Sequence, residues 1–234
     1  MCREGAGMPI RVNFEQELNN LKKSLAEMGK NVELSIDRLF DAMTNMDEGM
    51  TEALVKNERI INDMERAIEA QCLSLITRQQ PIVGDLRLIS AALKVVTDIE
   101  RVGDHAVDIA ELMLRWKGVN LLECSPHIPP MIEASKEMVH SAVEAFINQD
   151  SEHARRVIES DDIVDELFNK VKNDVINVLK QQESNSIASE TTADLSIDVM
   201  MIAKYLEKVG DHAVNIAEWE IFRETGSIQN VRLL

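Results

Sequence analysis

The sequence predicts an all-α protein made of two tandem, pseudo-symmetric three-helix bundles, with six long helices and an internal duplication. Aromatic residues are scarce, with two Trp, one Tyr and five Phe in 234 residues. Leu, Ile, Val, Ala and 12 Met must therefore fill the core, and this mixture suits helices better than sheets. Five prolines and nine glycines leave few turns. Between the prolines, apolar residues recur every three or four positions, which is the period of an amphipathic helix.

This spacing places each helix in turn. The first is expected over residues 13–47, where one face carries Leu18, Leu21, Leu25, Met28, Val32, Ile36, Leu39, Phe40 and Met43. The same period predicts the others over residues 49–79, 83–117, 129–149, 151–183 and 188–224. Prolines at 81 and 129 stand near the starts of the third and fourth helices, where proline is tolerated. No segment alternates in the manner of a half-buried strand.

The segment GVNLLECSPHIPP, residues 118–130, interrupts the helical pattern and divides the chain into two halves. Along the sequence we expect an N-terminal extension over 1–12, a first bundle over 13–118, a connection over 119–128, a second bundle over 129–225 and a C-terminal tail over 226–234.

The two halves are repeats of one another. Residues 35–47 align with 138–150 at an offset of 103. The dodecamer ERVGDHAVDIAE at 100–111 aligns with EKVGDHAVNIAE at 207–218 at an offset of 107, with ten of twelve residues identical. The extra four residues fall in the longer, more polar connection after the fifth helix, where insertions are tolerated. A duplicated three-helix unit follows.

The charge balance excludes one class of partner. The formal net charge is −16, and no cluster of Lys and Arg offers the basic face that nucleic-acid binding needs. Metal cations and basic protein surfaces remain open as partners. Three widely spaced cysteines suit a reducing cytoplasm, and the lack of any long apolar run predicts neither secretion nor direct membrane insertion.

The dodecamer stacks carboxylates on one helical face. Glu100, Asp104 and Asp108 fall at about 0°, 40° and 80° around the helix, and Glu207 with Asp211 repeats the pattern. Stacked like charges at this spacing cost about 0.2–0.5 kcal/mol per pair unless a cation compensates them. The second helix of each repeat offers facing oxygen donors at the same spacing, namely Glu58 with Asn62 and Asp161 with Asp165. Hard oxygen donors from two helices indicate a site for Mg, Ca, Mn or Fe.

A simpler interpretation stays open, in which the carboxylates form a solvated face with intrahelical ion pairs. Arg101 and Lys208 stand three residues before the two aspartates of the dodecamers and could neutralise them. The repetition of the whole pattern favours the metal site. Glycines 103 and 210 interrupt strong helical patterns, which predicts close approach of a neighbouring helix. His105 and His212 are turned about 140° from the glutamates, so we expect packing rather than ligation.

These motifs resemble the PhoU family of bacterial phosphate-uptake regulators, as does the opening MPIRVNFEQELNNLKKSLAEMG from Met8. The resemblance implies two three-helix bundles, each holding a multinuclear metal cluster of Fe, Zn, Mn or Mg. By position, the implied ligands are Glu58, Glu100, Asp104 and Asp108 in the first bundle and Asp161, Asp165, Glu207 and Asp211 in the second. Asn62 stands where the family usually has an aspartate, and Asn215 replaces the counterpart of Asp108, so the resemblance implies unequal occupancy.

The resemblance also implies a function. PhoU proteins damp phosphate uptake and phosphate-starvation signalling, as adaptors between the ATPase subunit of the phosphate ABC transporter and a sensor histidine kinase. We therefore expect a non-enzymatic, metal-binding cytoplasmic homodimer that meets the inner face of the membrane through its partners. The alternative is a carboxylate-bridged metalloenzyme of ferritin-like type. That site needs two Glu-x-x-His motifs, and the sequence offers only Glu137 to His140.

Overall fold

The computed structural model describes residues 10–45, 48–79, 81–116, 124–182, 189–228 and 231–232. It confirms the predicted fold class. The helices are α1 (Ile10–Asn45), α2 (Glu48–Gln79), α3 (Val83–Leu114), α4 (Ile128–Asn148), α5 (Ser151–Gln182) and α6 (Ser189–Thr225). Each helix begins and ends within three residues of the predicted position. Within these described ranges, no helix is both long enough and apolar enough to span a bilayer.

The two ends of the chain differ from the prediction. Helix α1 begins at Ile10, inside the segment 1–12 that we expected to precede the first bundle, directly after a proline that suits a helix start. The expected tail contains a short antiparallel pair of strands, β1 (Ser227–Ile228) and β2 (Val231–Arg232). Gly226 separates α6 from β1, because its φ of 75° ends the helix in a left-handed conformation that a residue without Cβ adopts easily.

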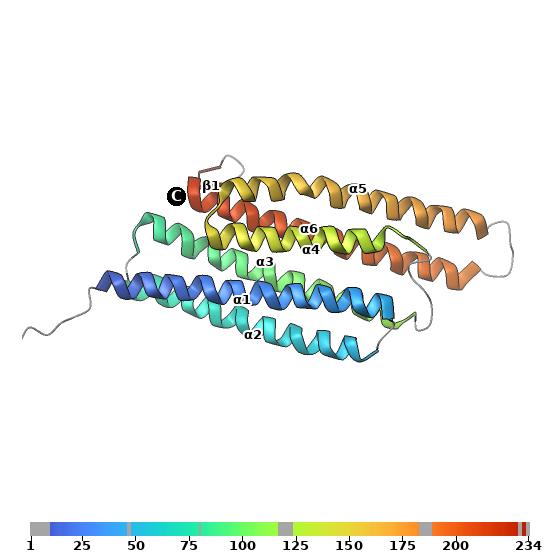
Figure 1. Ribbon diagram of the computed structural model, residues 1–234, viewed down its shortest axis with the longest axis horizontal. Helices are drawn as coiled ribbons and strands as arrows, with labels where there is room; N and C mark the ends of the chain where they lie inside the picture. Colours follow the sequence, from blue (N-terminus) through green and yellow to red (C-terminus); the bar gives the residue numbers. More distant parts are fainter. Residues whose placement is uncertain are drawn as a thin grey trace, which may run out of the picture.

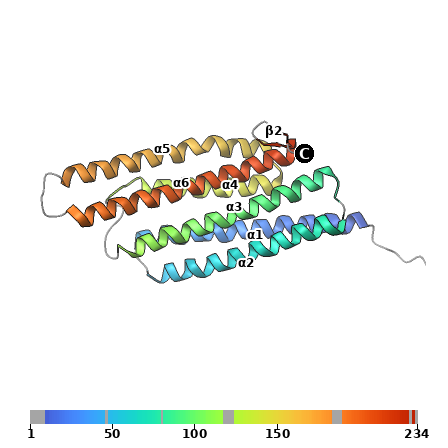
Figure 2. The same ribbon diagram turned by 180° about the vertical axis from the view of Figure 1, so that it is seen from behind.

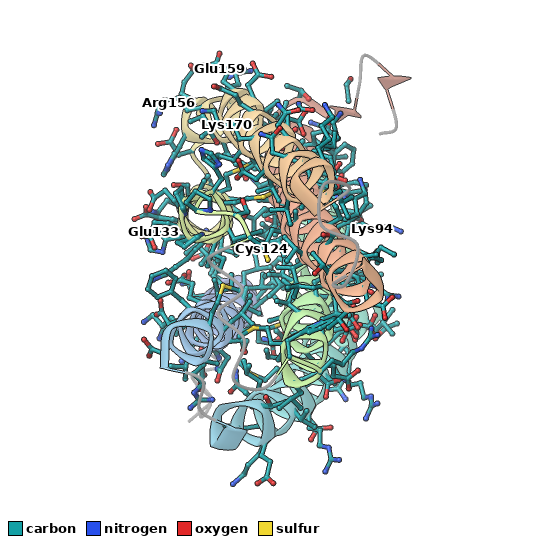
Figure 3. All side chains as sticks on the ribbon, turned by 90° about the vertical axis from the view of Figure 1, so that its right-hand side faces the viewer. Lys94, Cys124, Glu133, Arg156, Glu159 and Lys170 are labelled. Carbon is teal, nitrogen blue, oxygen red and sulfur yellow. The ribbon has the colours of Figure 1, made fainter. Side chains whose placement is uncertain are left out.

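The helices run up and down along one long axis (Figure 1). Seen end-on, α1, α3, α4 and α6 form a central group of four, while α2 and α5 lie outermost on opposite sides (Figure 3). The first bundle is α1–α3 and the second is α4–α6. Two antiparallel contacts join them, α1 against α4 and α3 against α6 (Figure 2).

Small residues make up much of the buried surface of α3 and α6. Helix α3 buries Ala91, Ala92, Ala106 and Ala110, and α6 buries Ala203, Ala213 and Ala217. Larger apolar side chains such as Ile99, Ile109 and Leu206 fill the space around them. Both helices are therefore buried over much of their circumference, and they form the centre of the molecule.

The duplication is visible in the contacts that α1 and α4 make between the two bundles. The His140 Nδ1 lies 3.0 Å from Glu33 Oε1, and Lys136 donates a hydrogen bond to Asp37. Adding the offset of 103 to Glu33 gives position 136, and adding it to Asp37 gives position 140. The two ion pairs are therefore equivalent by the pseudo-two-fold axis, with the acids on α1 and the bases on α4.

The α3–α6 seam obeys the same symmetry with different chemistry. His212 Nδ1 lies 2.8 Å from Asp98 Oδ1. The equivalent His105 instead packs on the ring of Tyr205, with the ring centres 5.4 Å apart. Positions 98 and 205 are related by the offset of 107, as are the two histidines. His212 therefore has a carboxylate as its partner across the seam, whereas the equivalent His105 has an aromatic ring.

A buried carboxylate fastens the end of α3 to α6. The Asp198 side chain accepts a hydrogen bond of 2.9 Å from Arg115 Nη1 and one of 2.6 Å from Trp116 Nε1. Asp198 is only 4% exposed, so these donors replace nearly all of its hydration. Its equivalent in the first bundle is Ala91, which makes this contact specific to one end of the seam.

We predict that Asp198→Ala lowers the free energy of unfolding by about 1–3 kcal/mol, because the Trp116 N–H loses its acceptor. Urea denaturation followed by Trp fluorescence measures the change. The matched control is Asp194→Ala, which removes an exposed carboxylate one turn earlier on α6 and should stay within about 0.5 kcal/mol of the parent. An unchanged urea midpoint for Asp198→Ala would show that the contact contributes nothing.

Candidate metal centre

The helices that carry the predicted ligands lie in direct contact, α2 with α3 and α5 with α6. The two dodecamer glycines permit the approach, as predicted. A Cβ added at Gly103 would lie 3.1 Å from Ile61 Cδ1, and one at Gly210 would lie 3.4 Å from Asp161 Oδ1. An alanine at 103 would require the Ile61 side chain to shift slightly, whereas one at 210 would make ordinary van der Waals contact.

The first acidic cluster joins predicted ligands of α2 and α3. Burial is the main cause that raises the pKa of Glu100, and the charges of Asp104, Glu65 and Glu58 raise it further. Asn62 donates a hydrogen bond from its amide nitrogen to the Glu58 carboxylate. The structure therefore brings both pairs of predicted donors within electrostatic reach of one another.

Glu65 is a member of this cluster that the sequence analysis missed. Burial raises its pKa first and the charge of Glu69 next, while a hydrogen bond with the Thr97 side chain lowers it. Asp104 also raises the pKa of Glu65 across the helix pair. The sequence did carry the signal, because position 65 follows Glu58 by two helical turns and lies on the same face.

The second acidic cluster joins α5 and α6 in the same way. The pKa of Asp161 is raised first by burial and then by the charges of Asp165, Asp211 and Glu207. Asp161 therefore lies within electrostatic reach of the other three predicted ligands of the second bundle. Without a cation between them, their mutual repulsion destabilises the folded state at neutral pH.

The two clusters also differ at two neighbouring positions, one on each helix. Where the first bundle has Glu65 and Thr97, the second has Phe168 and Lys204. The Lys204 Nζ lies 5.8 Å from the centre of the Phe168 ring and 2.5 Å from Glu207 Oε2. Glu65 thus has no carboxylate counterpart in the second cluster, and Lys204 adds an ammonium group there.

Asp108 lies at the edge of the first cluster and faces the seam between the bundles. Its Oδ2 is 3.3 Å from His105 Nδ1, and its charge, after burial, raises the pKa of Tyr205. Its equivalent Asn215 donates a hydrogen bond of 3.1 Å to Asp98. The two histidines pack against each other with ring centres 5.5 Å apart, in agreement with the predicted packing role.

The ion pairs of the simpler interpretation are also present. Arg101 Nη1 lies 3.5 Å from Asp104 Oδ2 and its Nε 3.7 Å from Glu100 Oε2. Lys208 contacts Asp211 and lies 3.7 Å from Glu207. The Arg101 side chain is 57% exposed, so its pairs contribute little to stability and can open at small cost.

The donor chemistry suits a hard cation, although the side chains do not enclose one. In the part of the chain that the structure describes, no three His, Cys, Asp or Glu side chains are grouped closely enough to hold a metal ion. The Asn62 Oδ1 is buried and has no hydrogen-bond partner, so an oxygen donor is left unsatisfied in the first cluster. Binding would require the carboxylates to turn from Arg101 and Lys208 toward the ion.

A Ser–His–Asp group at the start of α4 has a structural geometry. Ser125 Oγ donates to Asp174 Oδ2 over 2.6 Å, and His127 Nδ1 lies 2.6 Å from the same oxygen. A catalytic triad needs the histidine between the serine and the carboxylate, whereas both groups here bind the carboxylate. The group therefore anchors the start of α4 to α5.

The single Glu-x-x-His motif also lies outside both clusters. His140 binds Glu33 of α1 at the contact between the bundles, and its side chain is 50% exposed. The ferritin-like arrangement requires such histidines beside the bridging carboxylates in the bundle core. The position of His140 therefore does not support the alternative of a carboxylate-bridged oxidase.

Comparison with known proteins relates both halves to one domain. The family model for the PhoU domain matches residues 25–113 and again residues 128–219. A phosphate-specific transport system accessory protein PhoU homolog from Clostridium acetobutylicum is 35% identical over 214 residues, which are 91% of this chain and 94% of that protein. PhoU homolog 1 from Thermotoga maritima is 31% identical over 94% of this chain and 92% of its own length.

Solved structures share the fold. The crystal structure of PhoU from Pseudomonas aeruginosa superposes with a TM-score of 0.80 at 27% identity, covering 92% of this chain and 100% of that one. The PhoU structure from Streptococcus pneumoniae gives a TM-score of 0.82 over 93% of this chain and 100% of its own. Its identity of 24% supports the likeness of the fold alone.

We predict that Glu100→Gln raises the Tm of chelator-treated protein at pH 7. The folded-state pKa of Glu100 lies above its unfolded value, so ionisation costs stability as pH rises through these values. Relief of two like-charge neighbours at about 0.2–0.5 kcal/mol each corresponds to about 1–4 °C.

The pH dependence of this effect is part of the prediction. Below about pH 3 the carboxyl group is protonated in both states, so parent and variant should converge. Exposed Glu27→Gln on α1 is the control and should leave the Tm unchanged at both pH values. A Tm of Glu100→Gln below that of the parent at pH 7 contradicts the repulsion argument.

Proposed function

The chain belongs to the PhoU family, and from this premise we propose that it is an accessory protein of a phosphate transport system. The observation that carries the proposal is the double match of the family domain, over residues 25–113 and 128–219. Relatives described as transport accessory proteins align over more than nine tenths of the chain, so the likeness extends to both bundles and their connection.

Within that role we propose a negative regulator of phosphate uptake and phosphate-starvation signalling. It would act as a cytoplasmic, homodimeric adaptor between the ATPase subunit of the transporter and a sensor histidine kinase, close to the inner face of the membrane. The net charge of −16 supports action through proteins rather than through DNA.

This role predicts that the full-length chain binds both partner proteins. With the purified chain as bait, the transporter's ATPase subunit and the kinase should each be captured. Expression of the chain in cells that lack their own copy of this protein should lower phosphate uptake. Sedimentation measures the proposed homodimer in the same preparation. Failure to capture either protein, together with unchanged uptake, would contradict the proposed adaptor.

We further propose that both acidic clusters bind Fe, Zn, Mn or Mg ions. The ligands would be Glu58, Asn62, Glu100, Asp104 and Asp108 in the first bundle and Asp161, Asp165, Glu207 and Asp211 in the second. A bound cation supplies positive charge that relieves repulsion among these carboxylates. Glu65 adds a carboxylate near the first site, while Lys204 adds a competing ammonium at the second, so the first site should bind more tightly.

Matched double variants test this order of affinity. In Mn²⁺ titration calorimetry, Glu100→Gln with Asp104→Asn should weaken the tighter step by more than about tenfold. Glu207→Gln with Asp211→Asn should alter the weaker step and leave the tighter one unchanged. Unaltered metal content in the quadruple variant, measured by elemental analysis, would exclude these residues as ligands. Oxygen consumption by iron-loaded protein would favour the alternative oxidase.

A further inference from the structure

An apolar groove runs between α5 and α6 on the outside of the second bundle. It has a volume of about 380 Å³ and is lined by Phe168, Val175, Leu179, Ile197, Met200 and Met201, with Ser196 and Lys204 completing its wall. Ile197 is 60% exposed, and Leu179 and Met201 are each 39% exposed. Large apolar side chains gathered at this exposure are typical of a surface that contacts another molecule.

The internal duplication provides a control for this surface. The equivalents of Ile197 and Met201 in the first bundle are Ser90 and Lys94, and Lys94 points into solvent (Figure 3). Helices α2 and α3 pack together in the same way with these polar residues at the surface. The fold therefore does not require apolar residues here, and their presence in the second bundle needs another reason.

The α5 flank of the groove is basic on a strongly acidic chain, whereas α6 carries the exposed Asp194 one turn before Ile197. Lys172 lies one helical turn from both Phe168 and Val175, and Lys180 follows Leu179 directly. Among the described residues, neither lysine has an ion-pair or hydrogen-bond partner. The first-bundle equivalent of Lys172 is Glu69, so the sign of the charge is reversed between the two halves.

We propose that this α5–α6 groove binds an amphipathic helix of a partner protein, with an apolar face and acidic flanks. The groove follows α5 from Phe168 to Leu179, a length of about 17 Å or three helical turns. A furrow between two helices accepts the apolar face of a third, and methionines adapt to different side chains. The unpaired lysines select acidic flanks on the partner.

The proposed adaptor role supplies the need for a protein partner, whereas the groove itself depends on neither metal nor phosphate. The observations favour a helix over a lipid surface because the apolar residues line a concave furrow and the whole chain carries −16. A second copy of the chain is disfavoured because self-pairing of the groove would bring its lysines together.

The probe is a fluorescein-labelled amphipathic peptide of about 18 residues, with Leu on one face and Glu on the other. Its isomer carries Lys in place of Glu. Fluorescence anisotropy with the full-length protein measures both affinities. We expect the Glu peptide to bind at least about tenfold more tightly than the Lys peptide.

The variants copy the first bundle into the second. Ile197→Ser with Met201→Lys should weaken binding of the Glu peptide by about tenfold, since both side chains line the groove. Lys172→Glu should weaken it by about threefold or more at low salt and less at high salt. Leu73→Ser removes an apolar side chain that is 56% exposed on α2, and should change the affinity by less than about twofold.

Several results would overturn the proposal. These are no binding of the Glu peptide up to about 200 μM, equal binding of the two peptides, or an equal loss with Leu73→Ser. Groove-dependent binding to anionic phosphatidylglycerol vesicles would assign the surface to a membrane. Loss of self-association in the Ile197 and Met201 variant would assign it to a second copy. Because the assay contains no transporter, failure of the proposed role in capture experiments leaves this result intact.

Discussion

The close antiparallel contact of α3 with α6 is the constraint on which the arrangement of the other helices depends. Side chains of both helices meet in this seam: the rings of His105 and His212 lie 5.5 Å apart, and His212 contacts Asp98. Once these helices occupy the centre, their remaining faces must be covered by α1 and α4. Helices α2 and α5 are left on the outside, where each covers one face of a central helix and turns its cluster carboxylates toward that helix.

The same constraint explains why the acidic clusters face the outer helices, with Asp108 at their edge, while the histidines lie within the seam. In each dodecamer the glutamate and the first aspartate face the outer helix, and the histidine that follows points toward the other bundle. The same helical segment therefore contributes both to the contact with the outer helix and to the contact between the two bundles. A glycine within it lets the outer helix approach closely, so packing and charge are coupled at Gly103 and at Gly210.

Much of this could be predicted from the sequence because it is periodic and repeated. Helical spacing located the six helices, and the offset between halves located the acidic clusters. The missing cluster member, Glu65, was within reach of the same reasoning. The contacts of Asp198 with Arg115 and Trp116 were not, because they join single residues about 80 positions apart with no repeat to indicate them. The anchor formed by Ser125, His127 and Asp174 escaped prediction for the same reason.

The pseudo-two-fold seam also has an evolutionary consequence. In a dimer of two identical subunits with this interface, every mutation would appear in both subunits. It would therefore change both equivalent contacts at once. In a fused chain the copies are independent. Asp98 and Tyr205 occupy equivalent places with unlike chemistry, and Asp198 has an alanine as its counterpart. Fusion thus permits each half to specialise while the shared seam preserves the common architecture.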